Sequence, residues 1–288
     1  MRFVKKEVNT TPIEDTVFVI VEKAAKAKAQ YGKEKVVDAT IGSLYDEGGK
    51  LVAFDSVFNP YNEIPKETKA KYAGSFTGNP AYRKQVANWL IGNIDCKLKH
   101  SVIATPGGTG AVNITISECL DQGETVILPQ IAWGSYQLMA TMANLKTKSY
   151  TLFEGDHFNL KSFQETCSEV MAQQEKLVIV INDPCHNPTG YSLSKEEWQE
   201  VISFLNDCAK QVPVVLLNDI AYIDYAYDTA HSRDYMEQFN AISENVVVVI
   251  AFSCSKSLTS YGLRCGAALI LGQNEADVRG VEVVFEKA

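Results

Sequence analysis

A lysine stands at the end of the most apolar stretch of this sequence. Lys256 lies in FSCSKSLTSYGLRCG, directly after the run VVVVIA. An ammonium group is costly to bury, and a lysine directly after such an apolar run therefore needs a reason. Either Lys256 ends a strand and reaches water, or its amine serves as a nucleophile.

Polar groups also follow other apolar runs. PGGTG follows SVIAT, and its glycines would let backbone N–H groups approach an anion. DPCHNPTG follows KLVIVIN and holds Asn187 beside a proline, while VPVVLLN leads to Asp219 and Tyr222. Each signal is ambiguous alone, because such residues often only form turns or cap helices. PGGTG is neither a Walker A loop, since no Gly-Lys-Ser/Thr follows, nor a dinucleotide fingerprint, since Asn113 replaces the third glycine.

Taken together, and with Arg264 added, these groups match the needs of pyridoxal phosphate held as a Schiff base. That cofactor needs a lysine amine for its aldehyde and a carboxylate beside its ring nitrogen. It also needs donors for its ring oxygen and an anion site for its phosphate. We therefore expect these residues to meet at one edge of a sheet.

Four motifs occur in a fixed order: G-G-T-G (107–110), N-P-T-G (187–190), N-D-x-A-Y (218–222), and S-x-S-K with G-L-R (253–264). In these motifs the sequence resembles the class I aminotransferases of pyridoxal phosphate fold type I. IGSLYDEGGKLVAF, AWG and DPCHNPTG are similar to the aspartate and aromatic branch. The resemblance runs from about Pro12 to the last residue.

The resemblance implies a role for each matching residue. Lys256 would carry the cofactor and shuttle a proton, and Asp219 would pair with the ring nitrogen. Tyr222 and Asn187 would hydrogen-bond the ring oxygen. Trp133 would stack on the ring, and both Trp133 and Asn187 would lie beside the substrate.

The resemblance also implies a phosphate cradle, with Gly107 contributing through its backbone. Its members would be Gly107, Gly108, Thr109, Ser253 and Arg264. Tyr72 resembles a tyrosine that reaches the phosphate of a neighbouring subunit, which implies a homodimer. Gly42 falls in a loop on the substrate side.

Short β-branched runs would supply the elements that position these residues: 101–105, 124–129, 176–182, 212–218 and 245–252. Continuous apolar runs of this kind are typical of parallel strands covered on both faces. Ser194 and Glu197 form a capping box before a helix with Trp198, Val201 and Leu205 on one face. The fold class expected is α/β, with a mostly parallel central sheet and helices on both faces, as in the large domain of fold type I.

The resemblance predicts two regions, namely an arm with part of a small domain (1–60) and a cofactor-binding large domain (61–288). We expect the C-terminal small domain to be largely absent, since no residue matches the arginine that would bind a substrate's α-carboxylate. The final segment VRGVEVVFEKA reads as a helix. Its apolar residues at 278, 281, 284 and 285 would then lack the surface that they pack against.

Composition narrows the function classes. The net charge of −8 comes from 27 basic and 35 acidic residues without a basic block, which argues against nucleic acid or an anionic membrane as partner. No apolar stretch approaches membrane-spanning length. Seven cysteines without a C-x-x-C pair favour reduced thiols in the cytoplasm. The scattered histidines predict no metal site.

We therefore expect a pyridoxal phosphate-dependent aminotransferase, with an aspartate-type or aromatic amino acid as donor. It would exchange amino and oxo groups between an amino acid and a 2-oxo acid by a ping-pong mechanism. Two alternatives stay open: a pyridoxal phosphate-dependent lyase or decarboxylase of the same fold, and a catalytically inactive cofactor-binding remnant.

Overall fold

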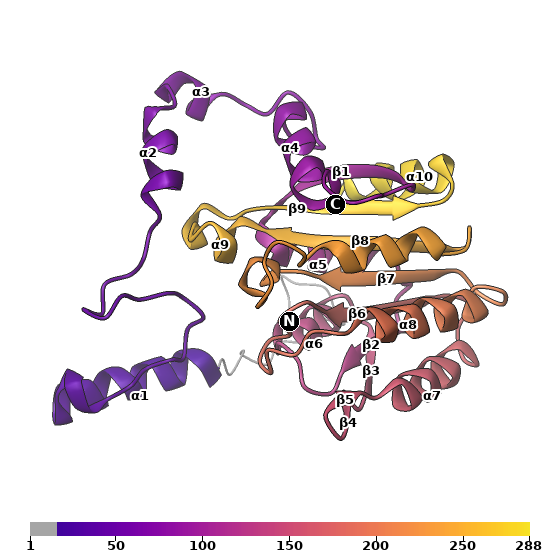
Figure 1. Ribbon diagram of the computed structural model, residues 1–288, viewed down its shortest axis with the longest axis horizontal. Helices are drawn as coiled ribbons and strands as arrows, with labels where there is room; N and C mark the ends of the chain where they lie inside the picture. The colour runs from indigo at the N-terminus through magenta and orange to yellow at the C-terminus, as the bar shows by residue number, and fades with distance from the viewer. Residues whose placement is uncertain (1–15) are drawn as a thin grey trace, which may run out of the picture.

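The computed structural model describes residues 16–288, which form a central sheet, helices packed on it and an N-terminal arm (Figure 1). Pro12 and the first fifteen residues of the expected arm lie outside this range. The sheet has seven strands in the order β1-β9-β8-β7-β6-β2-β3. Their bounds are β1 Lys99–Pro106, β2 Thr125–Pro129, β3 Lys146–Tyr150, β6 Leu177–Asn182, β7 Val214–Asp219, β8 Val246–Ser253 and β9 Cys265–Gly272.

Helices connect the strands, and a short ribbon of β4 (Phe153–Glu154) and β5 (His157–Phe158) stands apart from the sheet. The α-helices are α1 Thr16–Tyr31, α2 Asp55–Glu63, α3 Lys66–Ala70, α4 Pro80–Ile91, α5 Gly107–Glu118, α6 Ser135–Met142, α7 Leu160–Met171, α8 Lys195–Cys208, α9 Cys254–Ser257 and α10 Glu275–Phe285. The 3₁₀ turns are η1 Lys33–Lys35, η2 Ile223–Tyr225, η3 Asp234–Ala241 and η4 Tyr261–Leu263.

Strand direction decides where the polar strand ends meet. β2, β3, β6, β7 and β8 pair in parallel, and β9 runs antiparallel to both β8 and β1. The carboxyl ends of the parallel strands therefore share one edge of the sheet, and β9 begins at that edge. Asn182 pairs in register with Asp219, and Asp219 with Ala251. The prediction of a mostly parallel sheet is confirmed, and each of the five predicted runs forms a strand.

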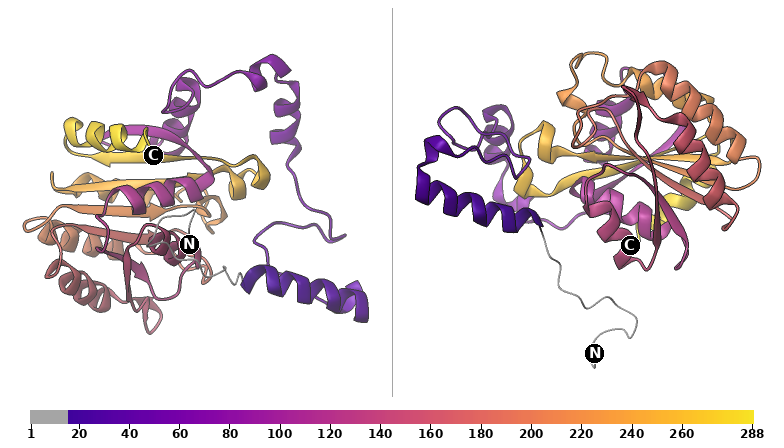
Figure 2. Two further views of the ribbon diagram at one scale, coloured as in Figure 1. Left: turned by 180° about the vertical axis from the view of Figure 1, so that it is seen from behind. Right: turned by 90° about the horizontal axis from the view of Figure 1, so that it is seen from below.

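Alternate residues of the strands face two separate cores. On β6, Leu177 and Ile179 join one core, and Val178 and Val180 join the other. Helices α4, α7 and α8 cover the first core, while α5, α6 and α10 cover the second (Figure 2). The expectation of helices on both faces is therefore confirmed. The capping box of α8 is also present, with the backbone N–H of Glu197 donating to the Ser194 hydroxyl at 3.1 Å.

The expectation that the apolar side of the last helix lacks a packing surface is wrong. In α10, Val278 and Phe285 are each only 3% exposed and belong to the second core. The helix follows β9 directly and packs on β1, β9 and α5, so this chain itself provides the surface. Val284, which was expected on the same face, is 42% exposed.

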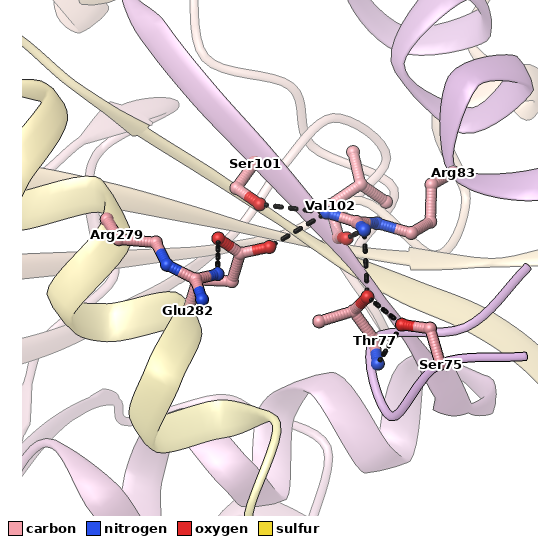
Figure 3. Close-up of polar contacts among 7 residues, drawn as sticks. All are labelled: Ser75, Thr77, Arg83, Ser101, Val102, Arg279 and Glu282. Carbon is pink, nitrogen blue, oxygen red and sulfur yellow. Dashed lines mark hydrogen bonds and ion pairs between the residues drawn. The ribbon is translucent and has the colours of Figure 1, made fainter. Parts of the chain in front are cut away.

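A polar network clamps the edge strand β1 between α4 and α10 (Figure 3). The guanidinium of Arg83 donates to Glu282 at 2.8 Å, to Thr77 at 2.8 Å and to the Val102 carbonyl. Arg279 pairs with the other oxygen of Glu282. Since α4 and α10 cover opposite faces of the sheet, this network ties the two layers together around the edge.

The N-terminal segment stands away from this body (Figure 1). None of the described residues from 19 to 76 is buried. Three contacts of its backbone hold the segment to the residues after β8: Leu44 N–H donates to the Tyr261 hydroxyl and Phe54 N–H to the Thr259 hydroxyl, each at 3.0 Å, and the Gly42 carbonyl accepts from Lys256 Nζ. Among the described helices, none is long and apolar enough to cross a membrane.

The network around Arg83 should contribute measurably to stability. Arg83→Ala leaves the largely buried Glu282 with Arg279 alone, so we expect a loss of about 2 kcal/mol in the free energy of unfolding in urea. Lys210→Ala is the control, because its pair with Asp207 is exposed and should contribute less than about 1 kcal/mol. Equal losses in the two variants would contradict the clamp.

Candidate active site

The carboxylate of Asp219 lies buried at the end of β7. Its Oδ2 accepts a hydrogen bond from the Tyr136 hydroxyl at 2.6 Å, and its Oδ1 accepts one from Ala221 N–H at 3.0 Å. The Asn182 side chain donates to the Asp219 carbonyl at 2.8 Å. Burial raises the pKa of this carboxyl group, while the hydrogen bonds from Tyr136 and Ala221 lower it. Among the described residues no cation pairs with it, so the carboxylate meets only neutral donors.

Lys256 enters the same region from the end of β8. The Ser253 hydroxyl accepts from Ser255 N–H at 3.1 Å and so caps the short helix α9 that carries the lysine. The lysine Nζ donates to the Gly42 carbonyl at 2.5 Å and lies 5.3 Å from the centre of the Tyr261 ring. Burial, and then the charge of Arg264, lower the pKa of Lys256. Both effects favour the neutral amine, which is the nucleophilic form.

An anion site adjoins the lysine. Arg264 begins the approach to β9 and donates to the Ser255 hydroxyl at 3.2 Å and to the Thr109 hydroxyl at 3.4 Å. It has no ion-pair partner among the described residues. The first turn of α5 adds unpaired backbone N–H groups and the positive end of the helix dipole. Gly107 has a φ of +72°, and a Cβ there would lie 2.5 Å from the Arg264 guanidinium.

These groups border one cavity of about 290 Å³. Nine predicted residues line it: Gly108, Thr109, Trp133, Asn187, Asp219, Tyr222, Ser253, Lys256 and Arg264. Gly107 lies behind Arg264, and Gly42 reaches the cavity through its carbonyl contact with Lys256. Tyr72 does not line the cavity, and its side chain is 95% exposed.

The sequence reasoning did not single out several lining residues, namely Ile41, Ser43, Tyr136, Asn182, Ala221, Ser255 and Tyr261. Six of them stood inside quoted stretches: Ile41 and Ser43 in IGSLYDEGGKLVAF, Asn182 at the end of KLVIVIN, Ala221 in N-D-x-A-Y, and Ser255 and Tyr261 in FSCSKSLTSYGLRCG. Tyr136 had only its place three residues after Trp133 as a signal. Its partner Asp219 is 83 positions away, a contact that no local pattern reveals.

The arrangement combines a nucleophilic amine, a buried carboxylate and an anion cradle around one space. Burial, and then the carboxylate of Asp219, raise the pKa of Tyr222, so its phenol is a protonated donor at neutral pH. The Asn187 backbone N–H donates to the Asn182 side chain at 2.7 Å, which fixes the loop that carries Asn187. Such a site could bind a phosphorylated, ring-containing carbonyl compound covalently.

The charge of Arg264 should be measurable at Lys256. Arg264→Gln removes a neighbouring cation, so the pKa of Lys256 should rise and its acylation should begin at higher pH. Acylation by acetic anhydride as a function of pH, read by peptide mass spectrometry in the cofactor-free protein, gives this pKa. Arg233→Gln is the control, because Arg233 pairs with Asp224 instead. An unchanged Lys256 pKa in Arg264→Gln would contradict the electrostatic coupling.

Comparison with known proteins identifies relatives of this arrangement. The sequence profile of the family described as aminotransferase class I and II matches residues 34–280. The mitochondrial aspartate aminotransferase of Schizosaccharomyces pombe is 24% identical over 276 residues, which cover 93% of this chain and 60% of that protein. The chain thus spans about three fifths of the length of the curated relatives it matches.

Solved structures agree with the sequence comparison. An aminotransferase from Anaerococcus prevotii superposes with a TM-score of 0.95 at 36% identity, over 100% of this chain and 71% of that one. An aromatic-amino-acid aminotransferase from Burkholderia pseudomallei, covalently bound to pyridoxal phosphate, has the same fold, with a TM-score of 0.76 at 20% identity over 98% of this chain and 69% of that one. The resemblance and the fold class inferred from the sequence are confirmed, and the chain belongs to the class I and II aminotransferases.

Proposed function

We propose that this chain builds the cofactor site of an aminotransferase that exchanges amino and oxo groups between an amino acid and a 2-oxo acid. The observation that carries the proposal is that Lys256, Asp219 and Arg264 border one cavity. The names of the relatives favour an aspartate-type or aromatic amino acid as donor.

The residues present fit pyridoxal 5′-phosphate. The buried Asp219 carboxylate lacks a cationic partner within the described chain, and a protonated ring nitrogen would supply one. Arg264 and the start of α5 suit a phosphate group, which Arg can bind through two parallel hydrogen bonds. Because Gly107 has no Cβ, it leaves room for the Arg264 guanidinium. The remaining phosphate contacts would come from Gly108, Thr109 and Ser253.

When bound, the cofactor supplies an aldehyde that condenses with amines and a ring that accepts electrons released at the substrate's α-carbon. Lys256 Nζ would hold the cofactor covalently and later move a proton at that carbon. Asp219 would hold the proton of the ring nitrogen. Tyr222 and Asn187 would donate to the ring oxygen, and Trp133 would pack on the ring.

The substrate would enter beside the Gly42 carbonyl, with Trp133 and Asn187 at the same side of the cavity. Since Gly42 O contacts Lys256 Nζ, the arm forms one wall of the reaction space. A Cβ on Gly42 would lie 3.1 Å from the Tyr222 hydroxyl, so a larger residue would crowd this wall.

We infer that the arm packs against a second copy of this chain, so that Tyr72 reaches the phosphate site of its neighbour. Tyr72 and Phe76 are 95% and 92% exposed, and such large exposed side chains favour a covered surface. We also infer the division into an arm with part of a small domain (1–60) and a cofactor-binding domain (61–288). The seven free cysteines support a reducing compartment, the cytoplasm.

The attachment point tests the proposed function. After incubation with pyridoxal 5′-phosphate and reduction with borohydride, peptide mapping should find the label on Lys256. Lys256→Ala should bind the cofactor without a covalent bond and lose catalysis by roughly 10²–10⁴-fold, whereas Lys210→Ala should keep the label. Labelling of a different lysine would overturn the assignment.

A half-reaction separates the enzyme classes. With aspartate or an aromatic amino acid, an aminotransferase should release the 2-oxo acid and leave the cofactor aminated. A lyase would return the cofactor to the aldehyde. An inactive remnant would release no 2-oxo acid and would leave the cofactor unchanged.

The assembly can be tested through Tyr72. Light scattering should give about twice the chain mass of 31.8 kDa. Tyr72→Ala should weaken cofactor affinity, whereas Tyr227→Ala, which removes another fully exposed tyrosine, should not. A stable monomer with full cofactor affinity would disprove both the dimer and the role of Tyr72.

A further inference from the structure

Tyr136 is a buried hydrogen-bond donor beside Asp219 to which the proposed function gives no role. Its side chain is 1% exposed, and its hydroxyl lies 2.6 Å from Oδ2 of Asp219. The ring is fixed edge-on to Trp133, with centroids 5.5 Å apart at 84°. The hydroxyl therefore has one well-defined direction, toward the carboxylate.

The electrostatic surroundings of Asp219 make this hydrogen bond important. Burial raises the pKa of Asp219, and the opposing contributions come from Tyr136 and Ala221 N–H. Tyr222 also faces the carboxylate, and Lys256 and Arg264 line the same cavity. Of these groups, the Tyr136 phenol is the side chain that donates directly to the carboxylate.

The phenol also keeps its proton. Burial, and then the carboxylate of Asp219, raise the pKa of Tyr136 well above its ordinary value. Tyr136 is therefore a donor throughout the neutral range and does not exchange its role with Asp219. An ionised carboxylate between two neutral donors keeps further lone pairs for a partner in the cavity.

We propose that Tyr136 is a positioning residue, whose hydroxyl keeps the Asp219 carboxylate ionised and turned toward the cavity. The inference rests on the proposed function for the identity of the group that Asp219 meets, the ring nitrogen of the cofactor. Tyr136 does not itself contact the reacting atoms and acts through Asp219.

The test titrates Asp219 in the full chain without cofactor. Aspartate labelled with ¹³C at the carboxyl carbon reports each side chain by NMR, and Asp219→Asn identifies the Asp219 signal. Loss of one hydrogen bond to a charged group should raise the Asp219 pKa in Tyr136→Phe by about one to two pH units. Tyr150→Phe is the matched control, because Tyr150 is equally buried but its hydroxyl donates to the Val180 carbonyl.

A second measurement uses the protein loaded with pyridoxal 5′-phosphate. Tyr136→Phe should keep the borohydride label on Lys256 but slow the half-reaction with amino acid by roughly tenfold to a hundredfold. Tyr150→Phe should change the rate by less than about threefold, since its hydroxyl donates to a neutral backbone carbonyl and not to the carboxylate.

The outcomes separate this inference from the proposed function. An Asp219 pKa that is raised in Tyr136→Phe but not in Tyr150→Phe supports the inference, even if Lys256 takes no label and the proposed function fails. An Asp219 pKa that stays unchanged, or that rises equally in Tyr150→Phe, overturns the inference, even if Lys256 is labelled. If Tyr136→Phe does not fold, the Asp219 pKa in the wild type decides. A value below neutrality supports the inference, and a value above neutrality overturns it.

Discussion

A carboxylate buried without a cationic partner among the described residues is the constraint around which this site is organised. Taking an ionised group out of water is unfavourable unless hydrogen bonds or an opposite charge compensate it. Asp219 ends the central strand β7, flanked by β6 and β8, where water is largely excluded. The surrounding elements supply the compensation: α6 brings a phenol, and the turn after β7 brings a backbone N–H. A protonated ring nitrogen would complete it.

Charged groups of both signs line the cavity. Arg264 and Lys256 line it together, Arg264 disfavours the charged form of Lys256, and Asp219 lines the same space. A ligand with an anionic group at one end and a protonated ring nitrogen at the other would relieve both imbalances. This complementarity explains why so many polar groups border a space formed by buried strands.

The sequence predicted the parts of the fold that depend on local patterns. Continuous apolar runs located five strands, and an S-x-x-E pair located the start of α8, because burial and capping leave a signature in neighbouring residues. The strand β3 was missed because KTKSY lies at the sheet edge and is mostly polar, and β9 because its small residues GAA resemble a loop. The Asp219–Tyr136 contact and the packing of α10 were missed because both depend on residues far apart in the chain.

The reversal of β9 has a consequence for how the cavity assembles. Because β9 turns back beside β8, Arg264 meets Ser255 across only nine positions of chain, whereas Tyr136 meets Asp219 across 83. The entropic cost of loop closure rises with the length of the closed segment, so the Arg264–Ser255 contact is the less demanding of the two to form. The Tyr136–Asp219 contact instead joins two elements, α6 and β7, that are far apart in the chain. Contacts that border one binding site thus close loops of very different length.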